Sequence, residues 1–256
     1  MKKVCLLAGS IGIAVLAFAQ VPPVRSDVYA WADRPVEKKG TSERRAVLEG
    51  RGAVLQNMEI HATTIAPGAA PHAPHHHPEE ELIIIREGRL KVTINGETRT
   101  LGPGSIALAM PGEEHGFENA GETPATYYVL RYTSKDSGQA QPASRAGSSL
   151  MIDWEEVAYK PHDKGGRRDF FDRPTVMTKR FEMHVSTLNP GLKSHDPHRH
   201  KAEEIVLLVE GNTEMQIGDT VKKARPGDLI YLGSDTLHAI RNDDTKPCIY
   251  FAFQWE

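Results

Sequence analysis

Two groups of histidine and glutamate residues stand at spacings suited to binding a metal ion. Each group has the pattern HxHx3E followed by a further histidine, as His75, His77, Glu81 and His115 and again as His198, His200, Glu204 and His238. Residues two apart on a strand share a face, so each HxH pair can direct two imidazoles into one cavity. Three neutral imidazoles and one carboxylate suit Mn, Fe, Ni, Cu or Zn. An octahedral ion would keep two positions open for substrate or water, which favours catalysis over a structural role.

The two groups are copies related by a fixed offset. His75 and His198 are 123 positions apart, and the same offset relates the other three ligand pairs without insertion or deletion. A constant offset of this kind indicates internal duplication. It also places His76 opposite Arg199, which removes His76 from the ligand set.

The duplication predicts how the chain is divided. The repeated segments begin at Trp31 and Trp154, and the stretch between them is polar and rich in Ser, Gly and Ala, as flexible connections are. We therefore expect a leader at residues 1–19, an N-terminal domain at 20–133, a linker at 134–153 and a C-terminal domain at 154–256.

Short antiparallel strands are predicted within each repeat. Residues 82–85 and 205–209 are continuous apolar runs of strand length. Alternating runs follow and end in Asn95-Gly96 and Gly218-Asp219, dipeptides that tolerate positive φ and close tight hairpins. No helical periodicity of useful length stands outside the leader. The predicted fold class is all-β, with two tandem barrels of the jelly-roll kind.

Both repeats resemble the cupin superfamily. The first motif of that family sets HxHx3E between two glycines, here Gly68 and Gly88 and again Gly191 and Gly211. Its second motif joins a glycine, a histidine and an asparagine, here Gly104, His115 and Asn119 and again Gly227, His238 and Asn242. The resemblance covers both repeats. It implies cupin barrels with the metal inside and with the four matched positions of each repeat as ligands.

The departures from the family pattern precede the last histidine of each motif. The proline of the motif is replaced by Met110 in the first repeat and by Gly233 in the second. The glycine two residues later is kept as Gly112 but becomes Asp235 in the second repeat. We therefore expect the two loops to differ in shape.

Four further histidines recur in both repeats and are candidates for catalysis. They are His61, His72, His184 and His195. Close to a metal, each pair could donate a hydrogen bond to a ligand or act as general acid and base. A hydrogen bond to a backbone carbonyl is an equal alternative for each.

Other repeated residues carry structural expectations. Glu80 and Glu203 precede the ligand glutamates and should face the other side of their strands, where we expect them to be solvated. Trp31 and Trp154 are expected to close each core or the domain interface, with stacking on a ligand as the minor alternative.

Two arginine pairs also recur, Arg44-Arg45 and Arg167-Arg168. They could bind a carboxylate substrate through paired hydrogen bonds, but we favour ion pairs with acidic residues between the domains. A helical turn in this region is left open.

Composition and the leader bear on partners and location. The chain has 256 residues and a net charge of −3, without the basic stripe expected of a nucleic-acid or membrane-surface binder. Residues 1–19 have the basic, apolar and small-x-small regions of a secretory signal peptide, whose cleavage would leave Cys248 as the one cysteine. We expect a periplasmic or secreted protein, with a small-molecule substrate and no stable membrane insertion after cleavage. Homo-oligomers remain open.

Three classes of function follow. The resemblance to bicupin quercetin dioxygenases and oxalate decarboxylases implies an oxidoreductase acting on an oxygen-rich small molecule, and the complete ligand sets favour this class. The resemblance to bicupin aminohydrolases and sugar isomerases implies non-oxidative chemistry. The third class is a binding protein without turnover. The expected cofactor is a divalent transition metal, Mn or Fe first and Zn or Ni as alternatives, with one or two ions per chain because duplicated folds often keep catalysis in one copy.

Overall fold

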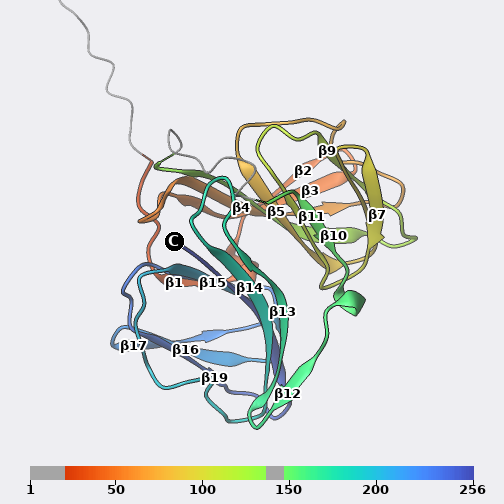
Figure 1. Ribbon diagram of the computed structural model, residues 1–256. Coiled ribbons are helices and arrows are strands. Elements are labelled where there is room, and N and C mark those ends of the chain that lie inside the picture. The colour runs from red at the N-terminus through yellow and green to blue at the C-terminus, as the bar shows by residue number, and fades with distance from the viewer. Residues whose placement is uncertain (1–20, 137–146) are drawn as a thin grey trace, which may run out of the picture.

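The computed structural model describes residues 21–136 and 147–256, which form two β-barrel domains (Figure 1). Apart from two single-turn 3-10 helices, η1 (Trp31–Asp33) and η3 (Trp154–Glu156), the described elements are strands. The prediction of two tandem all-β barrels is therefore confirmed. The predicted signal peptide lies outside the described residues. Among the described helices, none has the length and apolar character needed to cross a membrane.

The N-terminal domain consists of two antiparallel sheets. The larger has the strand order β11-β8-β5-β10-β4-β3-β2, and the smaller has the order β7-β6-β9. Their bounds are β2 (Val36–Lys39), β3 (Ser42–Gly50), β4 (Leu55–Ile65), β5 (Glu80–Glu87), β6 (Leu90–Ile94), β7 (Glu97–Leu101), β8 (Ile106–Ala109), β9 (His115–Asn119), β10 (Ala125–Ser134) and β11 (Leu150–Ile152).

The C-terminal domain repeats this arrangement. Its larger sheet has the order β1-β18-β15-β20-β14-β13-β12, and its smaller sheet the order β17-β16-β19. The bounds are β1 (Asp27–Tyr29), β12 (Lys160–His162), β13 (Gly165–Arg173), β14 (Phe181–Leu188), β15 (Glu203–Glu210), β16 (Thr213–Ile217), β17 (Thr220–Ala224), β18 (Leu229–Leu232), β19 (His238–Asn242) and β20 (Cys248–Trp255).

The domains exchange one short strand each. β1 pairs with β18 in the C-terminal domain, and β11 pairs with β8 in the N-terminal domain. The two exchanged strands are 123 positions apart, so the exchange is reciprocal and extends the duplication upstream of the two tryptophans. β11 falls within the range 134–153, so this end of the predicted linker is a sheet strand, while residues 137–146 lie outside the described part of the chain.

Residues 82–85 of β5 are continuously apolar because both faces of the strand are covered there. In β5, Ile83 and Ile85 pack inside the barrel, whereas Leu82 and Ile84 belong to a second core that the two domains share. A strand buried on both faces needs no polar alternation. The hairpin after β6 also forms as predicted, with φ of 50° at Asn95 and 83° at Gly96, as a type I′ turn requires.

The prediction that Glu80 and Glu203 are solvated is wrong. Both do face away from the barrel interior, but that side is the domain interface, and they are 0% and 1% exposed. Glu80 accepts hydrogen bonds from Tyr132 Oη and from the backbone N–H of Met177 in the other domain. Glu203 accepts from Tyr231 and Trp255 and from two backbone N–H groups of the N-terminal domain. Donors thus replace the water that a buried carboxylate loses.

Candidate metal centres

The first ligand set converges inside the N-terminal barrel. His75, His77 and His115 each offer one nitrogen, and these atoms all lie within 4.8 Å of one another. His75 and His115 are held together by paired backbone hydrogen bonds of 3.0 and 2.9 Å. Glu81, on β5, places Oε2 3.1 Å from His77 Nε2 and Oε1 3.5 Å from His115 Nε2. All four predicted ligands are therefore brought together.

The second ligand set repeats this geometry in the C-terminal barrel. His198, His200 and His238 also offer nitrogens within 4.8 Å of one another. Glu204 Oε2 lies 3.1 Å from His200 Nε2 and 3.3 Å from His238 Nε2. Both barrels therefore carry the same three imidazoles and one carboxylate.

Backbone carbonyls orient several of the rings. His115 Nδ1 donates to the Glu113 carbonyl at 2.9 Å, and His238 Nδ1 donates to the Thr236 carbonyl at 2.8 Å. His200 Nδ1 donates to the Ala202 carbonyl at 2.9 Å. In a neutral ring the proton then sits on Nδ1, which leaves the Nε2 lone pair free to bind a cation.

The ligand atoms fit a divalent transition metal. The Nε2 atoms of His115 and His238 are buried and have no aligned hydrogen-bond partner among the described residues. Burial alone would raise the pKa of Glu81 and Glu204, but the neighbouring imidazoles hold both at about 2. Each site therefore combines an ionised carboxylate with unpaired imidazole nitrogens, a donor set that suits Mn, Fe, Ni, Cu or Zn.

The loops before the last histidines have the same shape, contrary to the prediction. Gly112 has a φ of 77° and donates its N–H to the His77 carbonyl at 2.9 Å. Asp235 has a φ of 58° and donates to the His200 carbonyl at 2.8 Å. The left-handed conformation survives the loss of glycine because Asp tolerates it better than most residues. The backbone hydrogen bond to the HxH segment therefore determines the shape of each loop.

Each ligand set opens onto a cavity. The N-terminal cavity has a volume of about 470 Å³, and the other candidate histidines His61 and His72 line it beside His75 and Glu81. The C-terminal cavity has a volume of about 320 Å³, and His184 and His195 line it beside the four ligands. Both volumes lie at the small end of the range for ligand pockets.

His72 and His195 lie against the first ligand of each set. The His72 ring is 4.3 Å from that of His75, and the His195 ring is 4.1 Å from that of His198, each edge to face. Both use Nδ1 for a local backbone carbonyl at 3.0 Å. Burial and the His72 charge lower the pKa of His75, and burial and the His195 charge lower that of His198. His72 therefore favours the neutral, ligating form of His75, and His195 favours that of His198.

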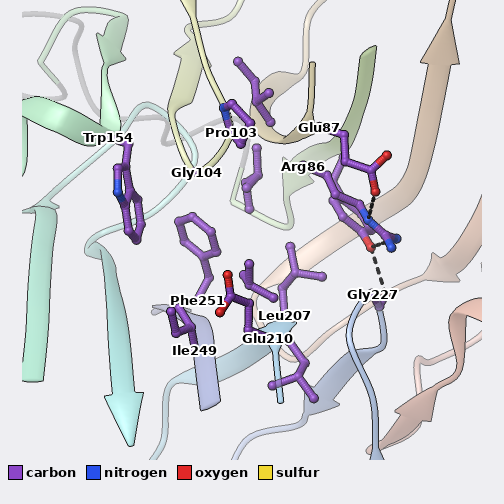
Figure 2. Close-up of a pocket in the computed structure, with 15 residues that line it drawn as sticks. Arg86, Glu87, Pro103, Gly104, Trp154, Leu207, Glu210, Gly227, Ile249 and Phe251 are labelled. Carbon is purple, nitrogen blue, oxygen red and sulfur yellow. Dashed lines mark hydrogen bonds and ion pairs between the residues drawn. The ribbon is translucent and has the colours of Figure 1, made fainter. Parts of the chain in front are cut away.

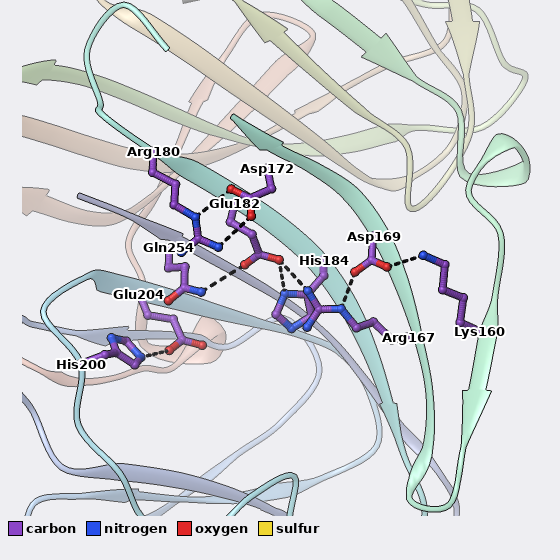
Figure 3. Close-up of polar contacts among 10 residues, drawn as sticks. All are labelled: Lys160, Arg167, Asp169, Asp172, Arg180, Glu182, His184, His200, Glu204 and Gln254. Atoms are coloured by element: carbon purple, nitrogen blue, oxygen red, sulfur yellow. Dashed lines mark hydrogen bonds and ion pairs between the residues drawn. The ribbon is translucent and has the colours of Figure 1, made fainter. Parts of the chain in front are cut away.

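His61 and His184 belong to a different cluster, built from an arginine, a glutamate and a histidine on adjacent strands. In the C-terminal domain, His184 Nδ1 donates to Glu182 Oε1 at 2.8 Å, and Arg167 donates to the same oxygen at 2.8 Å (Figure 3). Gln254 donates to Glu182 Oε2 at 3.3 Å. Figure 3 shows Glu182 between these three partners, with the His200–Glu204 pair nearby.

The N-terminal cluster carries a second arginine. Arg44 and Arg131 each bind one oxygen of Glu59. His61 Nδ1 lies 3.0 Å from Glu59 Oε1, but the atoms are not aligned as a hydrogen bond. The His61 contact, together with the arginines, outweighs burial and lowers the pKa of Glu59 to about 2.

The structure decides the open question of a helical turn near the arginines and corrects their expected ion pairs. Arg44 and Arg167 lie in β3 and β13, not in a helical turn, because these strands pair along the sheet with β4 and β14. Their ion pairs with Glu59 and Glu182 lie within one domain, not between domains.

Sequence reasoning missed Glu59 and Glu182. The offset of 123 positions relates them, and each stands two residues before His61 or His184, so strand alternation puts them on the same face. The same offset relates Tyr127 to Tyr250, which also line the two cavities. A comparison of the repeats beyond their histidines would have found these residues.

Comparisons with known proteins agree with the duplication. The family model of the cupin domain matches residues 61–131 and 184–253, more than half of the chain. Comparison with curated proteins finds no match. Among solved structures, AerE from Microcystis aeruginosa has 18% sequence identity and a TM-score of 0.69, covering 87% of this chain and 97% of its own.

Two further solved structures have a similar fold. Oxalate decarboxylase from Lactobacillus farciminis, in complex with formate, has 12% identity and a TM-score of 0.70, with 91% of this chain and 87% of that chain covered. The protein Ylba from E. coli has 15% identity and a TM-score of 0.69, with 90% of each chain covered. At such identities the likeness concerns the fold alone.

Proposed function

The chain belongs to the cupin-domain family, and from this premise we propose that it is a metal-dependent enzyme that acts on a small oxygen-rich carboxylate or polyhydroxylated compound. The reaction is decarboxylase-like or dioxygenase-like, and the C-terminal barrel carries it. The observation on which the proposal rests is the aligned His184–Glu182 pair beside a complete ligand set in one cavity.

The His184–Glu182 pair is suited to moving a proton. Glu182 accepts the Nδ1–H of His184 and thereby fixes the tautomer, so that Nε2 is available to accept a proton. The carboxylate also stabilises the imidazolium that would form. In the N-terminal domain, Arg131 takes the place of Gln254 on Oε2 of the equivalent Glu59, and the His61–Glu59 contact is not aligned as a hydrogen bond. For this reason we assign turnover to the C-terminal site.

The lining of the C-terminal cavity favours an anionic substrate. His162, Lys164 and Arg167 line it at the positions of Lys39, Thr41 and Arg44 of the first repeat, so these positions hold two Lys or Arg residues in each repeat and the carboxylates make the difference. The N-terminal cavity also contains the carboxylates of Glu37 and Glu43, at positions where the second repeat has Lys160 and Gly166. A small carboxylate therefore meets less repulsion in the C-terminal barrel.

A divalent ion bound by His198, His200, Glu204 and His238 would supply Lewis-acid or redox chemistry at the substrate oxygens. The chain itself does the rest. Arg167 and Lys164 orient the carboxylate, His184 accepts or returns a proton at Nε2, and Glu182 holds the ring in position. The apolar side chains of Val206, Met215 and Ile240 line the cavity beside the ligands and limit access of water.

Non-oxidative chemistry is the second candidate, and the same histidine pair favours it. Isomerisation, elimination and amide hydrolysis all need a positioned acid or base near a metal-bound oxygen. A binding protein without turnover remains the third candidate, but it would have no use for a proton-transfer pair.

Metal content and gas exchange test the proposal together. The mature chain, purified without a histidine tag, should bind a divalent transition metal, with Mn or Fe expected first and two equivalents at saturation. Small dicarboxylates and polyhydroxylated aromatics are then screened for CO2 release and O2 uptake. Turnover with neither gas points to the non-oxidative candidate, and no turnover of any compound class with fully loaded protein contradicts the proposal of an enzyme.

We further propose export, because the leader has the pattern of a cleaved signal peptide. Cell fractionation should place the mature chain outside the cytoplasm, with the N-terminus near Gln20. Size-exclusion chromatography with light scattering will determine whether copies associate.

A further inference from the structure

A third cavity lies between the two domains, away from both ligand sets. Its volume is about 370 Å³. Figure 2 shows Trp154 on one side of it and the Arg86–Glu87 pair on the other, with Phe251, Leu207 and Glu210 between them. Arg86 is paired with Glu87, so Glu210 is the lining carboxylate without an ion pair among the described residues. Together with the Trp154 ring, it suits a ligand that is both planar and positively charged.

The duplication shows what fills the equivalent place beside Trp31, where Arg86, Tyr128 and Gly227 line the opposite wall of the same cavity. There, the guanidinium of Arg86 lies 4.1 Å from the centre of the Trp31 ring. Its Nε donates to Glu87 at 3.1 Å, and its Nη1 donates to Tyr128 Oη at 3.4 Å. The Tyr128 hydroxyl in turn donates to the carbonyl of Gly227 at 2.8 Å. The chain therefore supplies its own cation to Trp31.

The cation has no counterpart at Trp154. Trp154 is equivalent to Trp31, and Arg168 lies 4.5 Å from its ring as Arg45 lies 4.3 Å from Trp31. However, the position equivalent to Arg86 is Val209, and that equivalent to Tyr128 is Phe251. Both the second guanidinium and the hydroxyl are therefore missing on this side.

The missing groups leave matching surface uncovered. Gly227, beneath Arg86, is buried, whereas its equivalent Gly104, beside Trp154, is partly exposed. Glu210 is equivalent to Glu87, yet no ion pair involves it among the described residues, whereas Glu87 pairs with Arg86. The Trp154 end of the cavity thus presents an aromatic ring and a carboxylate equivalent to those that Arg86 contacts, with Val209 in the position of that arginine.

We propose that this cavity binds a small organic cation with a guanidinium group, which stacks on Trp154 and pairs with Glu210. The apolar wall of Leu207, Ile249 and Phe251 would hold a short aliphatic chain attached to the cation. The site is separate from both metal centres, so its ligand is neither the metal nor the substrate proposed above. A cation bound there contacts both domains and would stabilise their interface.

A matched pair of probes tests the charge requirement. Calorimetric titration of the full mature chain with 1-butylguanidinium should give one site per chain. Butylurea has nearly the same shape and no charge, and should bind at least about tenfold more weakly because it cannot make the cation–π and ion-pair contacts. Equal binding of both probes, or no binding of the guanidinium, overturns the proposal.

Substitutions locate the site. Val209→Arg should abolish guanidinium binding, because the new side chain supplies the cation that Arg86 supplies at Trp31. Glu210→Gln and Trp154→Leu should each weaken binding about tenfold. Val221→Arg adds the same charge at a side chain that is 62% exposed and outside the cavity, and should leave binding unchanged. If Val209→Arg binds as the unaltered chain does, or if Val221→Arg loses binding equally, the assignment is wrong.

Discussion

The two barrels differ little at their metal ligands and more strongly around them. Each has three histidines whose nitrogens converge within the same distance and a glutamate held ionised beside them. Among the residues next to the ligands, Arg131 of the first barrel corresponds to Gln254 of the second. The contact between the neighbouring glutamate and histidine is unaligned in the first barrel, whereas it is a hydrogen bond in the second. Duplication has therefore preserved the geometry that binds the ion and varied the groups that would use it.

Removing one ligand from each barrel gives the sharpest test of that difference. His200→Ala and His77→Ala should each lose one metal equivalent while the chain stays folded, since neither ligand belongs to a hydrophobic core. Only His200→Ala should lose activity, by about 10³-fold, as expected when several kcal/mol of transition-state stabilisation are removed. Elemental analysis and steady-state kinetics measure the two effects. Equal loss of activity in both variants would mean that the barrels act together.

The proton-transfer pair should give the next largest effect. His184→Gln should lower kcat about 100-fold with its metal content unchanged, because a positioned acid or base contributes a factor of this size. His61→Gln is the matched control in the other barrel and should keep kcat within about twofold. If both variants retain full activity, the acid–base role assigned to His184 is wrong.

Exchange of the residue that distinguishes the barrels should act more mildly. Gln254→Arg gives Glu182 the second guanidinium that Glu59 has, and should draw the carboxylate away from His184. We expect kcat to fall about tenfold, since positioning groups around a metal site typically cost 10-fold to 100-fold when altered. Double substitution with His184→Gln should bring no further loss. An additive loss would show that residue 254 acts independently of His184.

The buried carboxylates at the interface predict an asymmetry in stability. Glu203 accepts four hydrogen bonds, two of them from the other domain, so Glu203→Gln should lower the free energy of unfolding by about 2 kcal/mol at pH 7. Glu80→Gln should cost less at this pH, because burial raises the pKa of Glu80 despite its hydrogen bonds and the amide resembles the protonated form. Denaturant titrations of both variants measure the difference.

The pKa of Glu80 also sets the direction of a pH effect. A raised pKa in the folded state means that Glu80 stabilises the fold most below its usual pKa of 4.5, and that this contribution falls as the pH rises. The destabilisation caused by Glu80→Gln should therefore be largest near pH 4 and shrink towards pH 7. If the destabilisation caused by Glu80→Gln increased with pH, the raised pKa of Glu80 would be contradicted.

The repeat offset and the family pattern predicted the fold and the ligand groups because both depend on local spacing. The burial of Glu80 and Glu203 could not be predicted in this way, since it depends on how the second domain covers the strand. The exchange of β1 and β11 is likewise a contact between domains, invisible to strand periodicity. Glu59 and Glu182 could have been predicted from the sequence as site residues, because they are related by the same offset as the ligands.

The smallest expected effect concerns the loop that the two barrels build from different residues. Asp235 holds the left-handed conformation that Gly112 holds in the first barrel, with φ of 58° and 77°. Asp235→Gly should therefore relieve backbone strain of at most about 1 kcal/mol, partly offset by the greater entropy of glycine in the unfolded chain. Gly112→Asp should cost a similar amount, with no loss of metal from either barrel. The hydrogen bonds to the His77 and His200 carbonyls come from the backbone, so both loops should keep their shape. A loss of metal in Gly112→Asp would mean that the side chain, not the backbone, fixes the ligand segment.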